Sequence, residues 1–147
     1  MVLETLYPGI VAHVLAQRYL RNMAIKVETK LVAVVDDDEL MRSALQGLLK
    51  AAGYSSRVFA SAEEFLSSGI QRTAACLIAD VRMPGMSGLE LFAKLDDDRC
   101  SIPTIFITAH GGTKMRMEAL RAGAAEFLTK PFDKTVLLQH VRAALES

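Results

Sequence analysis

Short apolar runs alternate with amphipathic segments from residue 31 to the end of the chain. Five apolar runs predict strands, at residues 31–35, 57–60, 76–79, 104–108 and 125–128. Between them, leucine, methionine and phenylalanine recur at the spacing of one helix face, which predicts helices. We therefore expect an α/β fold of the (βα)5 doubly wound type, in which a parallel five-stranded sheet carries helices on both faces.

Glycine and serine residues support the boundaries of these helices. Gly53 and Gly123 follow two of the predicted helices, where a residue with positive φ commonly ends a helix. Ser61 and Ser87 each precede a glutamate by three residues, the pattern of a capping box that opens a helix. These four positions agree with the alternation of strands and helices.

The first thirty residues do not follow this alternation. We therefore expect an N-terminal extension at residues 1–30 and a separate domain at residues 31–147. Within the extension, Pro8 suits a helix start, and an apolar stripe follows it, made of Ile10, Val11, Val14, Leu15 and Leu20. Two interpretations stay open: a helix that packs on the domain or on a partner, or residues upstream of a natural start at Met23.

The composition fits one folded domain and narrows the class of function. Hydrophobic residues make up 51% of the chain, enough for a buried core, and 17 basic residues balance 17 acidic ones. This charge balance argues against direct binding of nucleic acid. Cys76 and Cys100 fit neither a zinc site nor a disulfide framework. Without a membrane-spanning run or a signal peptide, we expect a cytoplasmic location and no membrane association.

Polar side chains follow four of the five predicted strands. Asp36 and Asp37 follow the first strand, Asp80 the third, and Lys130 the fifth, while Thr108 ends the fourth. In parallel sheets, ligands bind at the edge where the carboxyl ends of the strands meet. We therefore expect these five side chains to converge.

This set of groups indicates a site for phosphoryl transfer. Clustered carboxylates without cysteine or histidine are ligands that suit Mg²⁺. A lysine can neutralise a phosphate as a point charge, and a hydroxyl can donate one hydrogen bond to a phosphoryl oxygen. In such a site, catalysis rests mostly on charge neutralisation and positioning.

The motifs at these strand ends resemble a known family. They read DVRMPGMSGLEL, FITAHG and EFLTKPF, and the intervals are 43 residues from Asp37 to Asp80, 28 to Thr108 and 22 to Lys130. Residues 31–147 are similar to the receiver domains of bacterial two-component response regulators, above all to those of nitrogen-fixation and LuxR-type regulators. The resemblance implies a flavodoxin-like (CheY-like) fold with strand order 2-1-3-4-5.

The resemblance also implies roles for the acidic residues. Asp80 would be the phospho-acceptor, which takes a phosphoryl group from a sensor histidine kinase or a phosphotransfer protein. The metal ligands for Mg²⁺ would be Asp36, Asp37, Asp80 and the backbone carbonyl of Arg82. Enzymatic activity would be limited to Mg²⁺-dependent self-phosphorylation and dephosphorylation.

Three further residues would bind the phosphoryl group or transmit its arrival. Thr108 and Lys130 would contact the phosphoryl group, and Thr108 would act with Phe127, the switch aromatic. The surface formed by the fourth helix, fifth strand and fifth helix of the domain would then change, and a homodimer could form through it. We expect no output domain in this chain. A stand-alone receiver and the receiver part of a longer DNA-binding regulator both stay open.

Two other classes of protein fit the residues less well. Haloacid dehalogenase-type phosphatases also form an aspartyl-phosphate after a first strand, but their Asp-x-Asp-x-Thr/Val pattern conflicts with Leu40, and Asp80 would have no role. A receiver-like interaction module that works without phosphorylation would lack the acceptor aspartate or the lysine, and both are present.

The remaining polar residues near these motifs have simpler interpretations. Asp38 and Glu39 lie outside the family's motif and suit the start of a helix, where the dipole favours acidic residues. A second acidic run, residues 96–98, is expected to end the third helix of the domain in solvent. His110 is expected to be a solvated loop histidine rather than a proton shuttle.

Overall fold

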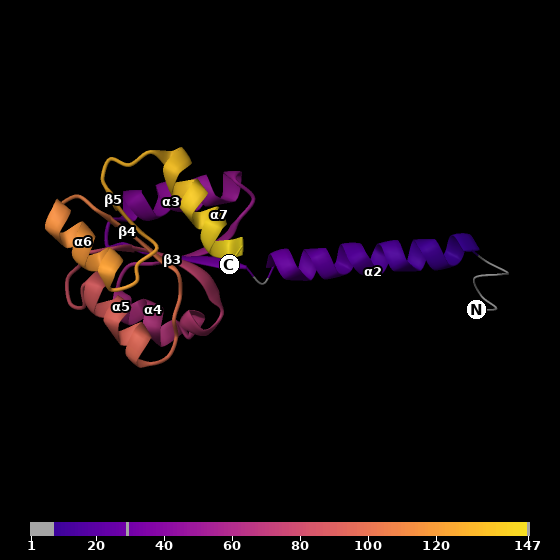
Figure 1. The fold of residues 1–147 in the computed structure, drawn as a ribbon, viewed down its shortest axis with the longest axis horizontal. Coiled ribbons are helices and arrows are strands. Elements are labelled where there is room, and N and C mark those ends of the chain that lie inside the picture. The colour runs from indigo at the N-terminus through magenta and orange to yellow at the C-terminus, as the bar shows by residue number, and fades with distance from the viewer. Residues whose placement is uncertain (1–7, 29, 147) are drawn as a thin grey trace.

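Five strands form one parallel sheet at the centre of the molecule (Figure 1). The computed structural model describes residues 8–28 and 30–146. The strands are β1 (Leu31–Val35), β2 (Ser55–Phe59), β3 (Ala74–Asp80), β4 (Thr104–Thr108) and β5 (Glu126–Thr129). All neighbouring pairs are parallel, in the order β2-β1-β3-β4-β5. The predicted architecture and strand order are confirmed.

Helices cover both faces of this sheet (Figure 1). One face carries α3 (Glu39–Ala51) and α7 (Lys134–Glu146). The other face carries α4 (Ala62–Ser68), α5 (Gly88–Asp97) and α6 (Thr113–Arg121), and a short 3-10 helix, η1 (Ile70–Arg72), follows α4. Because each helix returns the chain to the starting edge, the carboxyl ends of all five strands meet at the opposite edge.

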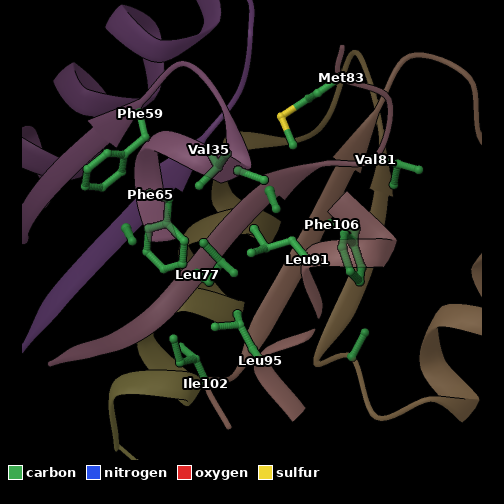
Figure 2. Close-up of a cluster of buried hydrophobic side chains, with 14 of the residues drawn as sticks. Val35, Phe59, Phe65, Leu77, Val81, Met83, Leu91, Leu95, Ile102 and Phe106 are labelled. Atoms are coloured by element: carbon green, nitrogen blue, oxygen red, sulfur yellow. The ribbon is translucent and has the colours of Figure 1, made fainter. Parts of the chain in front are cut away.

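The strands bury side chains on both faces because helices cover both faces. Along β1, Val32 and Val34 pack in the core beneath α3 and α7, whereas Ala33 and Val35 pack in the core on the other face. All four side chains are completely buried. Figure 2 shows the second core, in which the ring of Phe65 meets that of Phe59. A strand of this kind is apolar throughout, which explains why β1 could be predicted from its sequence.

Hydrogen bonds at the helix ends confirm the predicted caps. The hydroxyls of Ser61 and Ser87 each accept a hydrogen bond from the N–H of the glutamate three residues later, both at 3.1 Å. Asp38 caps α3 by accepting from the N–H two residues later, at 2.9 Å. Gly53 and Gly123 have φ values of +87° and +107°, the left-handed conformation expected after a helix.

The strand at the edge of the sheet begins earlier than the hydrophobic pattern predicts. The apolar run starts at Arg57, but β2 includes Ser55 and Ser56. Because β2 has a neighbour on one side only, and Ser55 and Arg57 are exposed, this strand does not need apolar residues throughout. The predicted bounds of β1 and β4 are confirmed, whereas β3 and β5 differ from the prediction by one or two residues at their ends.

The predicted N-terminal extension contains one long helix, α2 (Pro8–Glu28), which begins at the predicted proline. In Figure 1, α2 lies apart from the sheet and its helices. Ile10, Val14, Leu15 and Leu20 are between 49% and 63% exposed, so this stripe does not pack on the domain. Residues 1–7 lie outside the described residues. Across the described ranges, no helix is both long enough and apolar enough to cross a membrane. A cytoplasmic location stays a prediction.

A glycine is required where α5 begins beside the end of β3. Gly88 is buried, and its N–H donates to the carbonyl oxygen of Val81 at 2.8 Å. A Cβ atom at this position would lie 2.2 Å from the backbone oxygen of Asp80. Any larger residue would therefore push the start of α5 away from the strand that carries Asp80.

We expect Gly88→Ala to lower the free energy of unfolding by about 2–4 kcal/mol, because the added methyl group overlaps backbone that cannot move aside. The matched control is Gly47→Ala in α3, where nothing lies within 4 Å of the added Cβ. The control should raise the free energy of unfolding by roughly 0.5–1 kcal/mol, since alanine forms helices better than glycine. Urea unfolding measures both values. A Gly88→Ala protein as stable as wild type would contradict the close approach.

Candidate functional site

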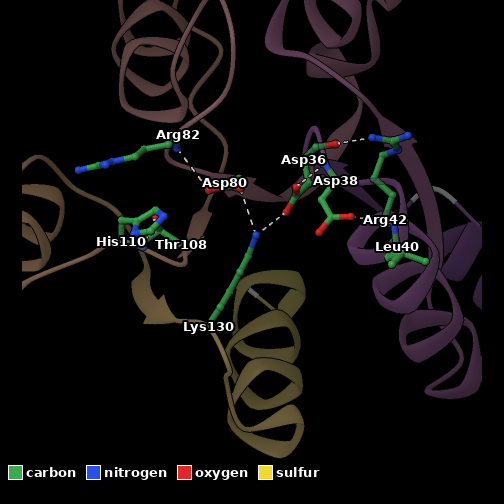
Figure 3. A network of polar contacts seen from close by, with 9 residues as sticks. All are labelled: Asp36, Asp38, Leu40, Arg42, Asp80, Arg82, Thr108, His110 and Lys130. Carbon is green, nitrogen blue, oxygen red and sulfur yellow. Dashed lines mark hydrogen bonds and ion pairs between the residues drawn. The ribbon is translucent and has the colours of Figure 1, made fainter.

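The five predicted site residues lie at the carboxyl edge of the sheet, and all of them except Asp37 are drawn in Figure 3. Asp36 and Asp37 follow β1, Asp80 is the last residue of β3, Thr108 is the last of β4, and Lys130 follows β5. The expectation that strand ends bring these residues to one place is therefore confirmed by the topology. The contacts among their side chains define the site.

One ammonium group joins two of the carboxylates. Lys130 Nζ lies 2.9 Å from Asp36 Oδ2 and 3.1 Å from Asp80 Oδ2 (Figure 3). Asp36 is completely buried and Asp80 is only 7% exposed. Water therefore screens these ion pairs much less than it would at the surface. The lysine extends from the end of β5 across β4 to reach both partners.

A third carboxylate stands beside this pair. Asp37 is exposed, but it offers a carboxylate oxygen within 4.8 Å of oxygens from Asp36 and Asp80. No hydrogen bond or ion pair joins Lys130 to Asp37, so the lysine compensates two of the three negative charges. An all-oxygen cluster with excess negative charge suits a hard divalent cation such as Mg²⁺.

The loop after β3 contacts one of these carboxylates, that of Asp80. The N–H of Arg82 donates to Asp80 Oδ1 at 3.3 Å, while Lys130 holds the other oxygen of that carboxylate. The Arg82 side chain itself is exposed and points away from the acids (Figure 3). Both oxygens of Asp80 are thus oriented by neighbours, while the metal-ligand role of the Arg82 carbonyl stays a prediction.

Burial and hydrogen bonding act in opposite directions on Asp36. Its burial raises the pKa of the carboxyl above the usual value, although the N–H of Asp38, at 2.9 Å, and the ammonium of Lys130 both oppose this rise. Arg42 donates to the backbone carbonyl of Asp36 at 2.8 Å and so holds the strand end in place. These partners therefore favour the ionised form of Asp36, but they do not fully offset the effect of burial on its pKa.

The same contacts keep the lysine charged. Burial alone would lower the pKa of Lys130, but hydrogen bonds to Asp36 and Asp80, with the attraction of both charges, outweigh burial and raise it. Lys130 therefore carries its positive charge throughout the neutral pH range.

The two predicted switch residues lie against one glycine. Thr108 is completely buried, and Phe127 is 3% exposed. A Cβ atom at Gly111 would lie 2.7 Å from the Thr108 methyl carbon and 2.6 Å from the Phe127 ring. Thr108 Oγ1 accepts a hydrogen bond from the N–H of His110 at 3.2 Å, and the His110 side chain is exposed as predicted. Gly111 therefore lets the threonine and the aromatic ring approach the same loop.

Three residues that shape this site were not predicted from the sequence. Gly88 directly follows the capping serine of α5, where glycine weakens a helix, and that position is a signal for close packing. Gly111 belongs to a glycine pair just after β4, a similar signal. Arg42 is one polar residue among several on an amphipathic helix, and nothing in the sequence singles it out.

Residues 32–142 match known proteins. A profile of the response regulator receiver domain matches this range. Transcriptional regulatory protein FixJ of Azorhizobium caulinodans is 41% identical over 114 residues, which cover 78% of this chain and 54% of FixJ. Response regulator protein TodT of Pseudomonas putida is 41% identical over 130 residues, 88% of this chain and 56% of TodT. The chain thus spans about half the length of these curated relatives.

The crystal structure of FixJ-N has the same fold. It superimposes with a TM-score of 0.72 at 41% identity, over 80% of this chain and 94% of FixJ-N. The range matched by the family profile includes every predicted site residue, from Asp36 to Lys130. The resemblance predicted from the strand-end motifs is confirmed: this chain belongs to the response regulator receiver domain family of two-component systems.

Proposed function

We propose that residues 31–147 form the phospho-acceptor domain of a two-component phosphorelay and that Asp80 receives the phosphoryl group. The observation that carries the proposal is the contact of Lys130 with both Asp36 and Asp80, with Asp37 beside them. Residues 1–30 would form a separate extension, since none of the described residues before Leu31 belongs to this cluster.

Mg²⁺ would be held by the three carboxylates and the backbone carbonyl of Arg82. The cluster fits this ion because its side-chain ligands are all oxygens and because one lysine leaves negative charge uncompensated. When bound, Mg²⁺ supplies positive charge that lowers the repulsion between the carboxylates and an incoming phosphoryl group.

Asp80 would supply the nucleophile. One of its carboxylate oxygens attacks phosphorus in line while the P–N bond to the donor histidine breaks, and the imidazole nitrogen keeps the bonding electron pair. The N–H of Arg82 and the ammonium of Lys130 orient the two oxygens beforehand. Lys130 can then neutralise a phosphoryl oxygen. The Thr108 hydroxyl accepts a hydrogen bond from the N–H of His110, so its own proton can be donated to another phosphoryl oxygen.

The phosphoryl group would change the surface of the domain through Thr108 and Phe127. If Thr108 moves toward the phosphoryl oxygen, it vacates space beside Gly111, against which the Phe127 ring already lies. A turn of that ring would alter the face formed by α6, β5 and α7. This is a shift between two populations, biased by the added charge.

Two partners follow from this scheme, a phosphoryl donor and a second copy of this chain. The phosphoryl donor would be a sensor histidine kinase or a phosphotransfer protein. The face of α6, β5 and α7, which is the predicted homodimer face, carries Glu126 between Arg116 at 3.0 Å and His140 at 3.3 Å. The second contact is an ion pair only while His140 is protonated. These contacts link all three elements, so the face would respond as a unit.

Asp80→Asn should abolish phosphorylation, because the amide cannot act as the nucleophile. Wild-type protein incubated with acetyl phosphate and Mg²⁺ should gain one phosphoryl group by intact mass. Asp97→Asn, at the exposed end of α5, is the control and should be labelled like wild type. Equal labelling of wild type and Asp80→Asn would show that another residue is the acceptor.

Asp37→Asn should separate metal binding from stability. The exposed Asp37 side chain adds repulsion without a partner in Lys130, so the metal-free variant should melt no lower than metal-free wild type. Wild type should gain about 1.4 kcal/mol from Mg²⁺ at roughly ten times Kd, and the variant much less at the same concentration. Thermal melts in EDTA and in millimolar Mg²⁺ measure both effects. A full gain from Mg²⁺ in the variant would exclude Asp37 as a ligand.

Asp36→Asn should change the pH dependence of stability. Burial raises the pKa of Asp36 in the folded state above 3.8, so the folded protein holds this proton more tightly than the unfolded chain does. The stability that Asp36 contributes is complete at pH values below its pKa in the unfolded chain. It is lost as pH rises through its pKa in the folded protein. Metal-free Asp36→Asn should therefore lose less stability than wild type as pH rises from about 4. Urea unfolding in EDTA across this range tests it, and parallel curves would contradict the prediction.

A further inference from the structure

The loop that follows Asp80 is tied to α4 by a single hydrogen bond. The loop, residues 81–87, connects β3 to α5 and contains Arg82, whose carbonyl is a proposed metal ligand. The N–H of Met86 donates to Glu63 Oε1, in the first turn of α4, at 2.7 Å. In the described part of the chain, no other hydrogen bond joins residues 82–87 to a segment distant in sequence. Glu63 is thus the one polar clamp on this loop.

Glu63 is free for this contact because its neighbour caps the helix. Ser61 accepts from the N–H of Glu64, and Glu64 Oε2 in turn accepts from the N–H of Ala60 at 3.3 Å. The N–H of Met86 is the main cause that lowers the pKa of Glu63 below its usual value. The clamp is therefore a charge-assisted hydrogen bond at neutral pH.

The backbone of the loop is shaped to fit this carboxylate. Gly85, just before Met86, has a φ of +76°, in the left-handed region that favours glycine. A Cβ atom at Gly85 would lie 2.7 Å from Glu63 Oε1. Gly85 and Met86 thus both accommodate Glu63. Met86 donates a hydrogen bond to its carboxylate, and the absence of a side chain at Gly85 leaves room for it.

The clamp lies between other fixed points of the same loop. The N–H of Gly88 holds the carbonyl of Val81, and the Met83 side chain is buried in the same core as that of Val81 (Figure 2). Arg82 lies between these anchored positions, and its N–H contacts the Asp80 carboxylate. A shift of the Met86 end would therefore change the path of the loop that carries the Arg82 carbonyl.

We propose that Glu63 is a positioning residue of the metal and phosphoryl site. It holds the N–H of Met86 and thereby fixes the Arg82 carbonyl relative to Asp80, without touching either the metal or the phosphoryl group. The inference rests on the proposed function, because it requires that the carboxylates and the Arg82 carbonyl bind Mg²⁺.

Four variants of the full chain distinguish the effect of side-chain length at position 63 from the effect of its charge. Glu63→Ala removes the carboxylate, Glu63→Asp keeps the charge on a shorter side chain, and Glu63→Gln keeps the reach and an acceptor oxygen without charge. Glu64→Ala is the matched control, since Glu64 is exposed in the same helical turn and contacts the cap rather than the loop.

Titration calorimetry with Mg²⁺ alone measures the effect. We expect the dissociation constant to rise about 10-fold in Glu63→Ala and Glu63→Asp, the lower end of the range for groups that orient metal ligands. Glu63→Gln should be weakened less than Glu63→Ala, because its amide oxygen still accepts from the N–H of Met86, while Glu64→Ala should stay within about 2-fold of wild type. If Glu63→Gln is weakened as much as Glu63→Ala while Glu63→Asp is not, the effect is long-range charge and the proposal is overturned. Unchanged affinity in Glu63→Ala overturns it as well.

Amide exchange in EDTA tests the clamp without metal. The Met86 amide should exchange at least about 10-fold faster in Glu63→Ala than in wild type, because its acceptor is gone, and equal rates would overturn the proposal. Wild type that protects Met86 but does not bind Mg²⁺ would refute the proposed metal site, and the positioning role with it. Wild type that binds Mg²⁺ with the same affinity as Glu63→Ala would refute the positioning role alone.

Discussion

The two ion pairs of Lys130 are the interaction on which the carboxyl edge of the sheet depends. They bring a cation from the end of β5 to carboxylates at the ends of β1 and β3, where Asp36 is completely buried. A buried carboxylate without such a partner would be neutral or would destabilise the fold. The lysine therefore makes it possible for a receiver domain to keep an acidic pocket. It leaves enough negative charge for a cation to bind.

The fold and the central residues of the site could be predicted because both depend on strand ends. The strands of the sheet interior are short apolar runs, and the residue after such a run lies at a known edge. Asp36, Asp80 and Lys130 follow from this rule. The start of β2 could not be predicted in this way, because an edge strand with one solvent-facing side carries serines that resemble a loop.

Residues that act from helices and loops could not be predicted in the same way. Arg42 reaches the backbone of Asp36, and Glu63 reaches the loop after β3, only because of how α3 and α4 are rotated on the sheet. That rotation is set by core packing, which a single sequence does not reveal. Gly88 and Gly111 depend on distances between segments that pack together only in the folded state. Both glycines can be singled out in the sequence, but the segments that they contact cannot.

The separation of the site residues along the chain has a consequence for folding. Lys130 contacts Asp36 across 94 residues and Asp80 across 50. Contacts this distant form late, because the loop-closure entropy of the intervening chain must be overcome first. The pocket is therefore complete only when β5, a strand of four residues at the edge of the sheet, has joined β4. A newly synthesised chain would therefore present Asp80, the proposed phospho-acceptor, before Lys130 arrives, and the pocket would be complete only in the finished fold.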